Sequence, residues 1–196
     1  MSAEIGHTGG MATPEIIAKL RRATADAHAR LEAALDLPAR LVDADERRRL
    51  VSRFLSLHES VEARLEPWSR SRPELNAATR PRAPLIRADL ALLGGAPEPA
   101  PVAPAVDSLG RALGWHYVLE GSALGGRVIE REMARRGVDS RGLSFLNPYG
   151  EQTGDRWRGL VALIDHLHRH GAAAADDIVA GGIEGFAHAE RVLCGA

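Results

Sequence analysis

The sequence is poor in several residues that mark common classes of protein. Cys194 is the only cysteine, which excludes an internal disulfide and is compatible with a reducing cytoplasm. Lys19 is the only lysine, so arginine supplies nearly all of the positive charge, with a forked group in place of a point charge. The formal net charge of −1 leaves no basic footprint for a nucleic acid. These absences argue against a disulfide-stapled scaffold and against a nucleic-acid-binding protein.

Long apolar runs are also missing. None approaches the roughly 20 residues that a membrane-spanning helix needs. Residues 1–13 are polar and contain glycine, without the charged and apolar regions of an export signal. We therefore expect a cytoplasmic protein with no membrane span, in which residues 1–13 form a flexible N-terminal segment. With 196 residues, 45% of them hydrophobic, the chain is long enough for one domain with a substantial core.

Helical periodicity is present along most of the chain, and no run alternates as a β-strand does. We expect a first helix with Thr13 as its N-cap, Pro14 at N1 and an end at Pro38, and a second that Asp43 caps and Pro67 ends. Further helices are expected over residues 84–93, 107–136, 155–170 and 174–194, with a linker at 96–105. The sequence thus predicts an all-α, single-domain helical bundle over residues 14–196.

The first of these helices carries a histidine beside its apolar stripe. At about 100° per residue, Ile16, Leu20 and Leu31 fall within one stripe, while His28 and Arg21 lie together on its shoulder. Two turns, roughly 10.5 Å, separate them along the helix axis. An imidazole for a metal and a guanidinium for an acid group would suit a flat cofactor that carries both. A half-buried histidine near a surface arginine is the plainer interpretation.

The helix expected at residues 107–136 contains a stripe of glycines. Gly110, Gly114, Gly121 and Gly125 recur at steps of four, seven and four. Each costs about 1 kcal/mol relative to alanine inside a helix, which is tolerated where something approaches the backbone closely. Close helix packing explains Gly110 and Gly114. The pair Gly125 and Gly126, with Gly121, also offers room for a planar ligand and a place to kink.

Three ordered segments together resemble the haem oxygenase family. They read LRRATADAH at residues 20–28, YVLEGSALGGRVI at 117–129 and NPYGEQTGDRW at 147–157. The resemblance extends over about residues 14–195 and is strongest to the bacterial, biliverdin-producing branch that is often found beside bacteriophytochromes. It implies a haem oxygenase-like helical bundle. It also implies that haem, as substrate and cofactor, is opened to biliverdin, CO and ferrous iron with O2 and an external electron donor, such as a ferredoxin or a reductase. A bacteriophytochrome is a possible acceptor of the biliverdin.

The resemblance also assigns roles to individual residues. His28 matches the axial ligand of the haem iron. Four residues match the distal helix that lies against the other face of the ring: Gly121, Ser122, Gly125 and Gly126. Arg21 matches a basic position that contacts a haem propionate. Tyr117 and Arg158 are further candidates for that role, with ordinary packing and surface charge as the alternatives.

One position departs from the family pattern. Many relatives have an aspartate that anchors distal water where this chain has Ser122, and serine orders water without acting as a carboxylate. Glu120 is nearby, but on a regular helix it points about 200° away from Ser122. Because of this departure, a non-catalytic haem-binding or haem-handling helical protein stays open as the alternative to the enzyme.

Other histidines are weaker candidates. His166 and His170 share a helix face at metal-ligand spacing, but no third ligand is evident. Histidines also suit the negative end of a helix dipole. His58 falls on an apolar stripe, where a histidine with a satisfied hydrogen bond in the core is the expected outcome.

Overall fold

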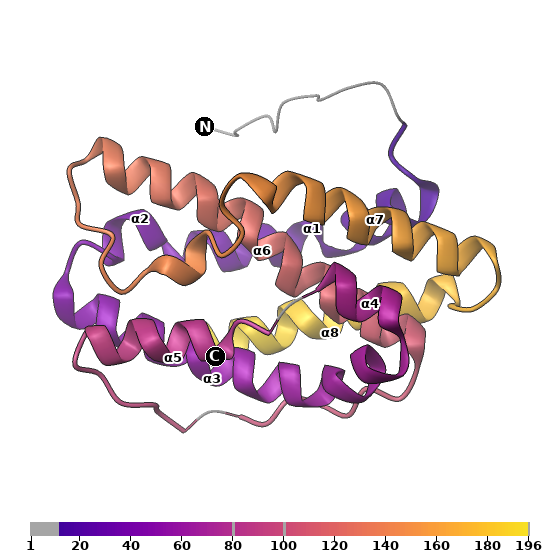
Figure 1. Cartoon of the computed structure of the whole chain (residues 1–196), viewed down its shortest axis with the longest axis horizontal. Helices are drawn as coiled ribbons and strands as arrows, with labels where there is room; N and C mark the ends of the chain where they lie inside the picture. Colours follow the sequence, from indigo (N-terminus) through magenta and orange to yellow (C-terminus); the bar gives the residue numbers. More distant parts are fainter. Residues whose placement is uncertain (1–11, 80, 100, 196) are drawn as a thin grey trace.

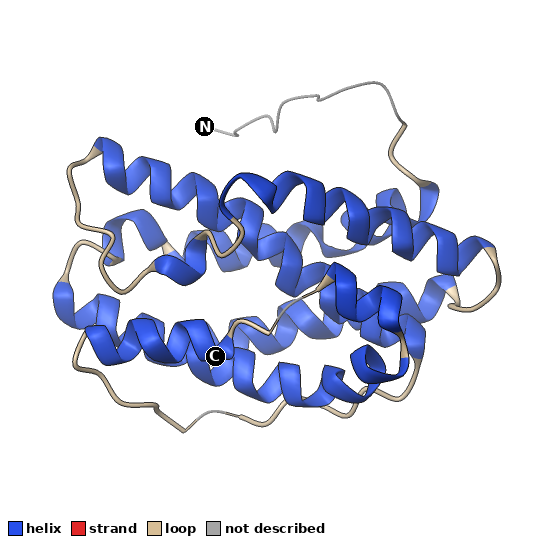
Figure 2. Cartoon of the chain, viewed as in Figure 1, coloured by secondary structure: helices blue, strands red, loops and turns tan. Residues whose placement is uncertain are grey.

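Helices form all of the regular secondary structure in the computed structural model, which describes residues 12–79, 81–99 and 101–195 (Figure 2). The long helices are α1 (Glu15–Leu35), α3 (Ala44–Ser71), α5 (Ala83–Leu92), α6 (Leu109–Arg135), α7 (Thr153–Arg169) and α8 (Ala175–Cys194). The short ones are α2 (Leu37–Arg40), α4 (Pro73–Ala78) and the 3₁₀ turns η1 (Ser144–Leu146) and η2 (Gly150–Gln152). The predicted all-α bundle is confirmed. Within the described ranges, no helix has the length and apolar character needed to cross a membrane.

Two predicted helix ends have the expected chemistry. The Asp43 carboxylate accepts hydrogen bonds from the backbone N–H groups of Asp45 and Glu46, at 3.0 and 2.8 Å, and so begins α3. At the end of α5, Gly94 adopts a left-handed conformation with φ +66°, and the N–H of Gly95 returns to the Leu90 carbonyl at 3.0 Å. Both ends follow from residues that satisfy otherwise unpaired backbone groups.

Three predicted boundaries were wrong. Helix α1 begins at Glu15 with Pro14 in the N-cap position, one residue later than expected, so Thr13 does not cap it. Pro67 lies inside α3, because a proline removes only one backbone hydrogen bond there and its neighbours Leu65 and Trp68 pack into the core. Helix α1 also ends earlier than expected, at Leu35, because Asp36 adopts a left-handed conformation, and Pro38 lies inside the separate short helix α2.

The centre of the bundle is the pair α6 and α8, which run in the same direction (Figure 1). Glycines bring the two backbones together. A Cβ atom on Gly114 would lie 2.2 Å from the Ile178 carbonyl oxygen, and one on Gly181 would lie 2.2 Å from that of Arg111. Gly110 likewise faces Asp177. The predicted packing role of Gly110 and Gly114 is therefore confirmed.

The remaining helices surround this pair. Helices α1 and α7 share an apolar cluster with the first half of α6, and α3 and α5 share another with α6 and α8. The described part of the 96–105 linker lies along α3, where Ser56 Oγ donates to the Glu98 carbonyl at 2.6 Å. It joins two parts of one core and does not separate two domains. Of the N-terminal segment predicted to be flexible, residues 1–11 lie outside the described residues.

Candidate functional site

The second half of α1 is a helical stretch whose side chains stay uncovered. The buried residues in the first half of α1 are Ile16, Ile17, Leu20 and Thr24, and the next buried residue is Leu35, the last of the helix. Yet the stretch between Thr24 and Leu35 holds His28 and Leu31 within an alanine-rich surface. Leu31 is partly buried against the core, while most other residues of the stretch are exposed, so this face of α1 is a candidate wall of a ligand-binding site.

The imidazole of His28 stands on this wall with its side chain 56% exposed. Its ring meets the ring of Phe186 edge to face, with centroids 5.5 Å apart and planes at 86°. Its Nε2 lies 3.5 Å from a carboxylate oxygen of Glu32, one helical turn later. The ring is thus held from one side by an aromatic contact and from another by an acid, while much of it faces open space.

A second uncovered stretch lies on α6. A Cβ atom placed on Gly125 would meet nothing within 4 Å, and Val128, one turn later, is 60% exposed. Gly121 borders the same stretch, where a Cβ would lie 3.4 Å from the Trp157 ring of α7. Gly126 behaves differently, because its Cβ would lie 2.1 Å from the Leu146 carbonyl oxygen of η1. Gly126 therefore accommodates the η1 backbone and does not face the open space.

Helix α8 contacts both α1 and α6, the two helices that carry these exposed segments. Phe186 contacts His28 of α1, while its neighbour Gly185 faces Val118 of α6, where a Cβ would lie 3.0 Å away. Because successive residues of a helix point about 100° apart, α8 lies between the two helices and contacts both. The candidate site is therefore the region beside α8 that lies between the exposed part of α1 around His28 and the open side of α6 at Gly125, with Trp157 next to Gly121; we refer to this region as the cleft.

The sequence-predicted anchors are placed unequally. Arg21 is exposed on α1 and its guanidinium has no carboxylate partner in the part of the chain that the structure describes. Arg158 instead pairs with Asp155 on the outer surface of α7. Tyr117 is buried, with its ring 5.0 Å from that of Trp157. Arg21 therefore has a guanidinium free for an anion, whereas Arg158 is already neutralised at an exposed position.

Ser122, which the sequence placed near the open stretch, is held by an arginine that sequence reasoning missed. Arg82, 4% exposed, donates from Nη1 to Ser122 Oγ at 3.1 Å and from Nη2 to the Leu119 carbonyl. The Ser122 hydroxyl donates to that same carbonyl at 2.7 Å. Its proton is thus engaged, and the hydroxyl position is fixed from two sides.

A chain of buried polar groups continues behind Arg82. The backbone N–H of Arg82 donates to Oε1 of Glu62 at 2.7 Å, and the same oxygen lies 2.8 Å from His58 Nδ1. Burial lowers the pKa of His58 to about 4, aided by the Arg82 charge and opposed by Glu62. His58 is therefore a neutral, satisfied core histidine, as its place on an apolar stripe predicted. In the sequence, the hint of this Arg82–Glu62–His58 group is Glu62, an acidic residue one helical turn after His58 on the buried side of its helix.

Glu120 belongs to a different group. The Tyr149 hydroxyl donates to both of its carboxylate oxygens, at 2.8 and 3.1 Å. Burial, and next the Glu120 charge, raise the pKa of Tyr149 well above its ordinary value. The Arg156 guanidinium lies over the Tyr149 ring, 4.7 Å from its centroid. Glu120 thus fastens the 147–152 loop to α6, and it does not stand in for a carboxylate at Ser122.

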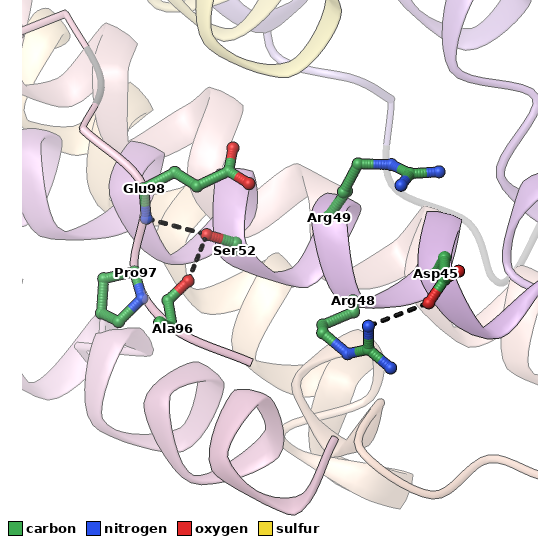
Figure 3. Close-up of a pocket in the computed structure, with 7 residues that line it drawn as sticks. All are labelled: Asp45, Arg48, Arg49, Ser52, Ala96, Pro97 and Glu98. Carbon is green, nitrogen blue, oxygen red and sulfur yellow. Dashed lines mark hydrogen bonds and ion pairs between the residues drawn. The ribbon is translucent and has the colours of Figure 1, made fainter. Parts of the chain in front are cut away.

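Two other places hold chemically active side chains without forming a comparable site. The rings of His166 and His170 lie 4.2 Å apart at the end of α7, but in the described residues no group of three or more side chains has the arrangement of a metal site. A surface hollow of about 260 Å³ lies between α3 and residues 96–98 (Figure 3). Its two arginines are already paired with acids, Arg48 with Asp45 at 2.9 Å and Arg49 with Glu46. None of the sequence-predicted site residues lines that hollow.

Comparisons with known proteins bear on the cleft. No family model matches the chain. The sequence is 34% identical over 155 residues to a protein named haem oxygenase from Xanthomonas campestris pv. campestris (strain 8004), covering 78% of this chain and 91% of that protein. The fold is similar to the crystal structure of the NO- and CO-bound haem oxygenase from Neisseria meningitidis, with a TM-score of 0.74 and 22% identity. That likeness covers 93% of this chain and 91% of the other.

Proposed function

This chain belongs to the haem oxygenase family and is an enzyme that acts on haem; we propose that the cleft between α1 and α6 is where haem binds and is opened. One observation carries the proposal. His28 stands on the exposed second half of α1 and contacts α8 through Phe186, while Gly125 marks the open side of α6, which also packs against α8. A flat ring with a ligand position on one face needs both features.

The residues present fit a haem. The space beside Gly125 is free of side chains, and apolar groups at Val128 and Phe186 border the cleft. An imidazole that is neutral at physiological pH is a common axial ligand of haem iron. When bound, haem supplies the iron at which oxygen is reduced and also the ring that is opened to biliverdin, CO and ferrous iron.

On the proximal side, we assign His28 as the ligand of the iron. Phe186 restricts the tilt of the imidazole through its edge-to-face contact, and the Glu32 carboxylate, 3.5 Å from Nε2, would orient the ring when it holds the iron. Such a carboxylate fixes the tautomer and raises the basicity of the ligand.

On the distal side, Gly121 and Gly125 allow the α6 backbone to approach the ring. We assign Ser122 the task of ordering a water molecule beside it. Its hydroxyl has a fixed position, because Arg82 donates to the oxygen while the hydroxyl proton goes to the Leu119 carbonyl. Gly126 supports this side indirectly, by admitting the η1 backbone behind the helix.

At the ring edge, we propose that Arg21 binds a propionate through its unpaired guanidinium. A forked pair of this kind is both attractive and directional. Tyr117 and Arg158 stay weaker candidates for the same contact. The structure favours Tyr117 of the two, since Trp157 connects it to the end of the cleft while Arg158 pairs with Asp155.

The wider reaction needs components from outside the chain. We propose that O2 and an external donor, a ferredoxin or a reductase, supply the oxidant and the electrons. We also propose a bacteriophytochrome as a candidate acceptor of biliverdin, because the sequence motifs resemble the biliverdin-producing branch that is often found beside bacteriophytochromes. A reducing cytoplasm suits a chain with one cysteine, Cys194, and is the compartment that we propose.

The test is spectroscopic. Purified protein loaded with one equivalent of haem is supplied with ascorbate and oxygen, and absorption is followed. We expect the Soret band to decay while a green product that co-elutes with biliverdin accumulates and CO is released. A haem spectrum that survives many minutes of reduction and aeration would contradict turnover, and it would favour a non-catalytic haem-handling protein.

A further inference from the structure

The interface between α6 and α8 contains a cluster of buried polar atoms that the haem cleft does not use. Trp115 Nε1, Glu184 Oε2 and His188 Nδ1 are inaccessible to solvent and have no hydrogen-bond partner within the described residues. Trp115 and His188 are 1% and 0% exposed. A buried polar group that lacks a partner costs free energy, so a cluster of three requires an explanation.

Two of the side chains, Trp115 and His188, are in contact, and Glu184 lies one turn before His188 on α8. The Trp115 and His188 rings have centroids 5.8 Å apart. One turn earlier on both helices, Arg111 pairs with the other oxygen of Glu184. Since α6 and α8 run in the same direction, the Arg111–Glu184 and Trp115–His188 contacts follow one another along the interface between the two helices. The three atoms without partners therefore lie in two adjacent contacts of the α6–α8 interface. We call this part of the interface the 115/184/188 seam.

The tautomer of His188 follows from its other nitrogen. Ser60 Oγ donates its proton to the Leu57 carbonyl at 3.0 Å, so toward His188 Nε2, 3.2 Å away, it can only accept. Nε2 therefore carries the proton, and Nδ1 presents a lone pair. Burial lowers the pKa of His188, and the Arg191 charge lowers it further, so the ring stays neutral. The seam thus offers one donor, the indole N–H, and two acceptors, Nδ1 and Glu184 Oε2.

We propose that a single internal water molecule joins Trp115, Glu184 and His188. Water has two protons to donate and accepts at its oxygen, so one molecule satisfies two acceptors and one donor at once. Buried waters typically make about three hydrogen bonds to groups that would otherwise be unsatisfied. A direct bond from the indole to either acceptor would leave the other acceptor unpaired, whereas the water satisfies all three.

The bridge has a consequence for the cleft, and this part alone rests on the proposed function. Phe186, which contacts His28, lies on α8 between the two residues that hold the water. Fixing Glu184 and His188 against α6 therefore fixes the floor against which the proximal imidazole packs. The bridge is a feature of the haem-free protein and exists whether or not the cleft binds haem.

The direct test is a crystal structure of the haem-free protein at a resolution that shows ordered solvent. We expect one solvent peak within hydrogen-bond distance, about 2.7–3.2 Å, of Trp115 Nε1, His188 Nδ1 and Glu184 Oε2. A dry seam, a direct bond between two of these groups, or a metal ion at the position would each overturn the proposal.

A solution measurement tests the same point without crystals. In the wild type, the Trp115 indole proton should exchange slowly and give a cross-peak to a long-lived bound water in a water-selective NMR experiment. In His188→Leu that cross-peak should be lost and the indole proton should shift upfield, while His166→Leu on exposed α7 should leave both unchanged. Trp115→Phe assigns the resonance. A wild-type indole proton that exchanges slowly without contact to water would contradict the bridge, whether or not the leucine variant folds.

Discussion

At the scale of single residues, the site depends on side chains that the fold leaves available. His28 and Arg21 are both exposed on α1, and neither is buried in the core that holds the helix in place. Their removal should therefore affect ligand binding far more than folding. The guanidinium of Arg21 has no acid partner among the described residues, and its place on the same side of α1 as His28 makes it the candidate for a propionate.

His28→Ala should abolish the spectrum of histidine-ligated haem and most of the turnover. The fold should persist, because the side chain is 56% exposed and its loss removes an edge contact with Phe186 and an exposed contact with Glu32. Haem titration followed by absorption, with circular dichroism as the check on folding, measures both. A variant that keeps the native haem spectrum and activity would show that the iron is bound elsewhere.

Arg21→Ala should weaken haem binding by about 1–3 kcal/mol, the range for a charge-assisted hydrogen bond. Its clearer effect should be on orientation, because a ring released at one edge rotates about the bond from iron to His28. Chromatography of the product should then show an altered ratio of biliverdin isomers. Arg158→Ala is the matched control, since its partner is Asp155 on the outer surface. Equal effects of the two substitutions would remove the special role of Arg21.

At the scale of secondary-structure elements, α6 combines two uses of glycine. Its first glycines let α8 approach, and Gly126 admits η1, whereas Gly125 borders open space. The sequence alone could predict that this helix has a bare stripe, since the spacing is visible. It could not assign Gly126 to packing, because that depends on where the 143–150 loop crosses the helix. The contact is between residues 20 apart and leaves no local pattern.

Gly125→Leu and Gly126→Ala should separate these uses. Gly125→Leu should block haem binding while the protein stays folded, since its Cβ meets nothing and leucine raises helix propensity by about 1 kcal/mol. Gly126→Ala should destabilise the protein, because a Cβ would lie 2.1 Å from a backbone oxygen. Thermal unfolding and haem titration of both variants measure the difference. If Gly125→Leu binds haem normally, the cleft does not extend along this part of α6.

The other elements also divide into features that local sequence patterns predict and features that depend on tertiary contacts. Helices with strong periodicity and side-chain caps, such as α3 with Asp43, were predictable at their start. Pro67 was read as a terminus because a local rule cannot see that tertiary packing of Leu65 and Trp68 outweighs one missing hydrogen bond. Likewise, His28 and Ser122 could be found from motifs, while Arg82 and Glu62 could not. Their pairing joins the start of α5 to the middle of α3, which no spacing along the chain reveals.

At the scale of the whole molecule, polar groups buried in the bundle tie its stability to pH. Burial lowers the pKa of both His58 and His116 to about 4. In the unfolded chain both return to an ordinary value of about 6.5. Between these values the unfolded state binds more protons than the folded state. Stability is therefore fully present above about pH 6.5 and is lost as the pH falls toward 4.

We expect the free energy of unfolding to fall by about 2 kcal/mol per histidine between pH 7.5 and pH 5. Urea unfolding at a series of pH values measures this loss. His116→Gln should reduce the slope of stability against pH by roughly half, whereas the exposed His170→Gln should leave it unchanged. NMR titration of the wild type should also show that both buried rings stay neutral at pH 5. Stability that is independent of pH over this range would contradict the burial of neutral histidines.

The central claim is that haem binds between α1 and α6, with His28 on its iron and the glycines of α6 against its other face. The crystal structure of the haem-loaded protein tests it most directly. The account predicts an iron–nitrogen bond to His28, Gly121 and Gly125 in contact with the opposite face of the ring, and a propionate beside Arg21. Haem bound through another histidine, or at a surface away from α1 and α6, would contradict the account.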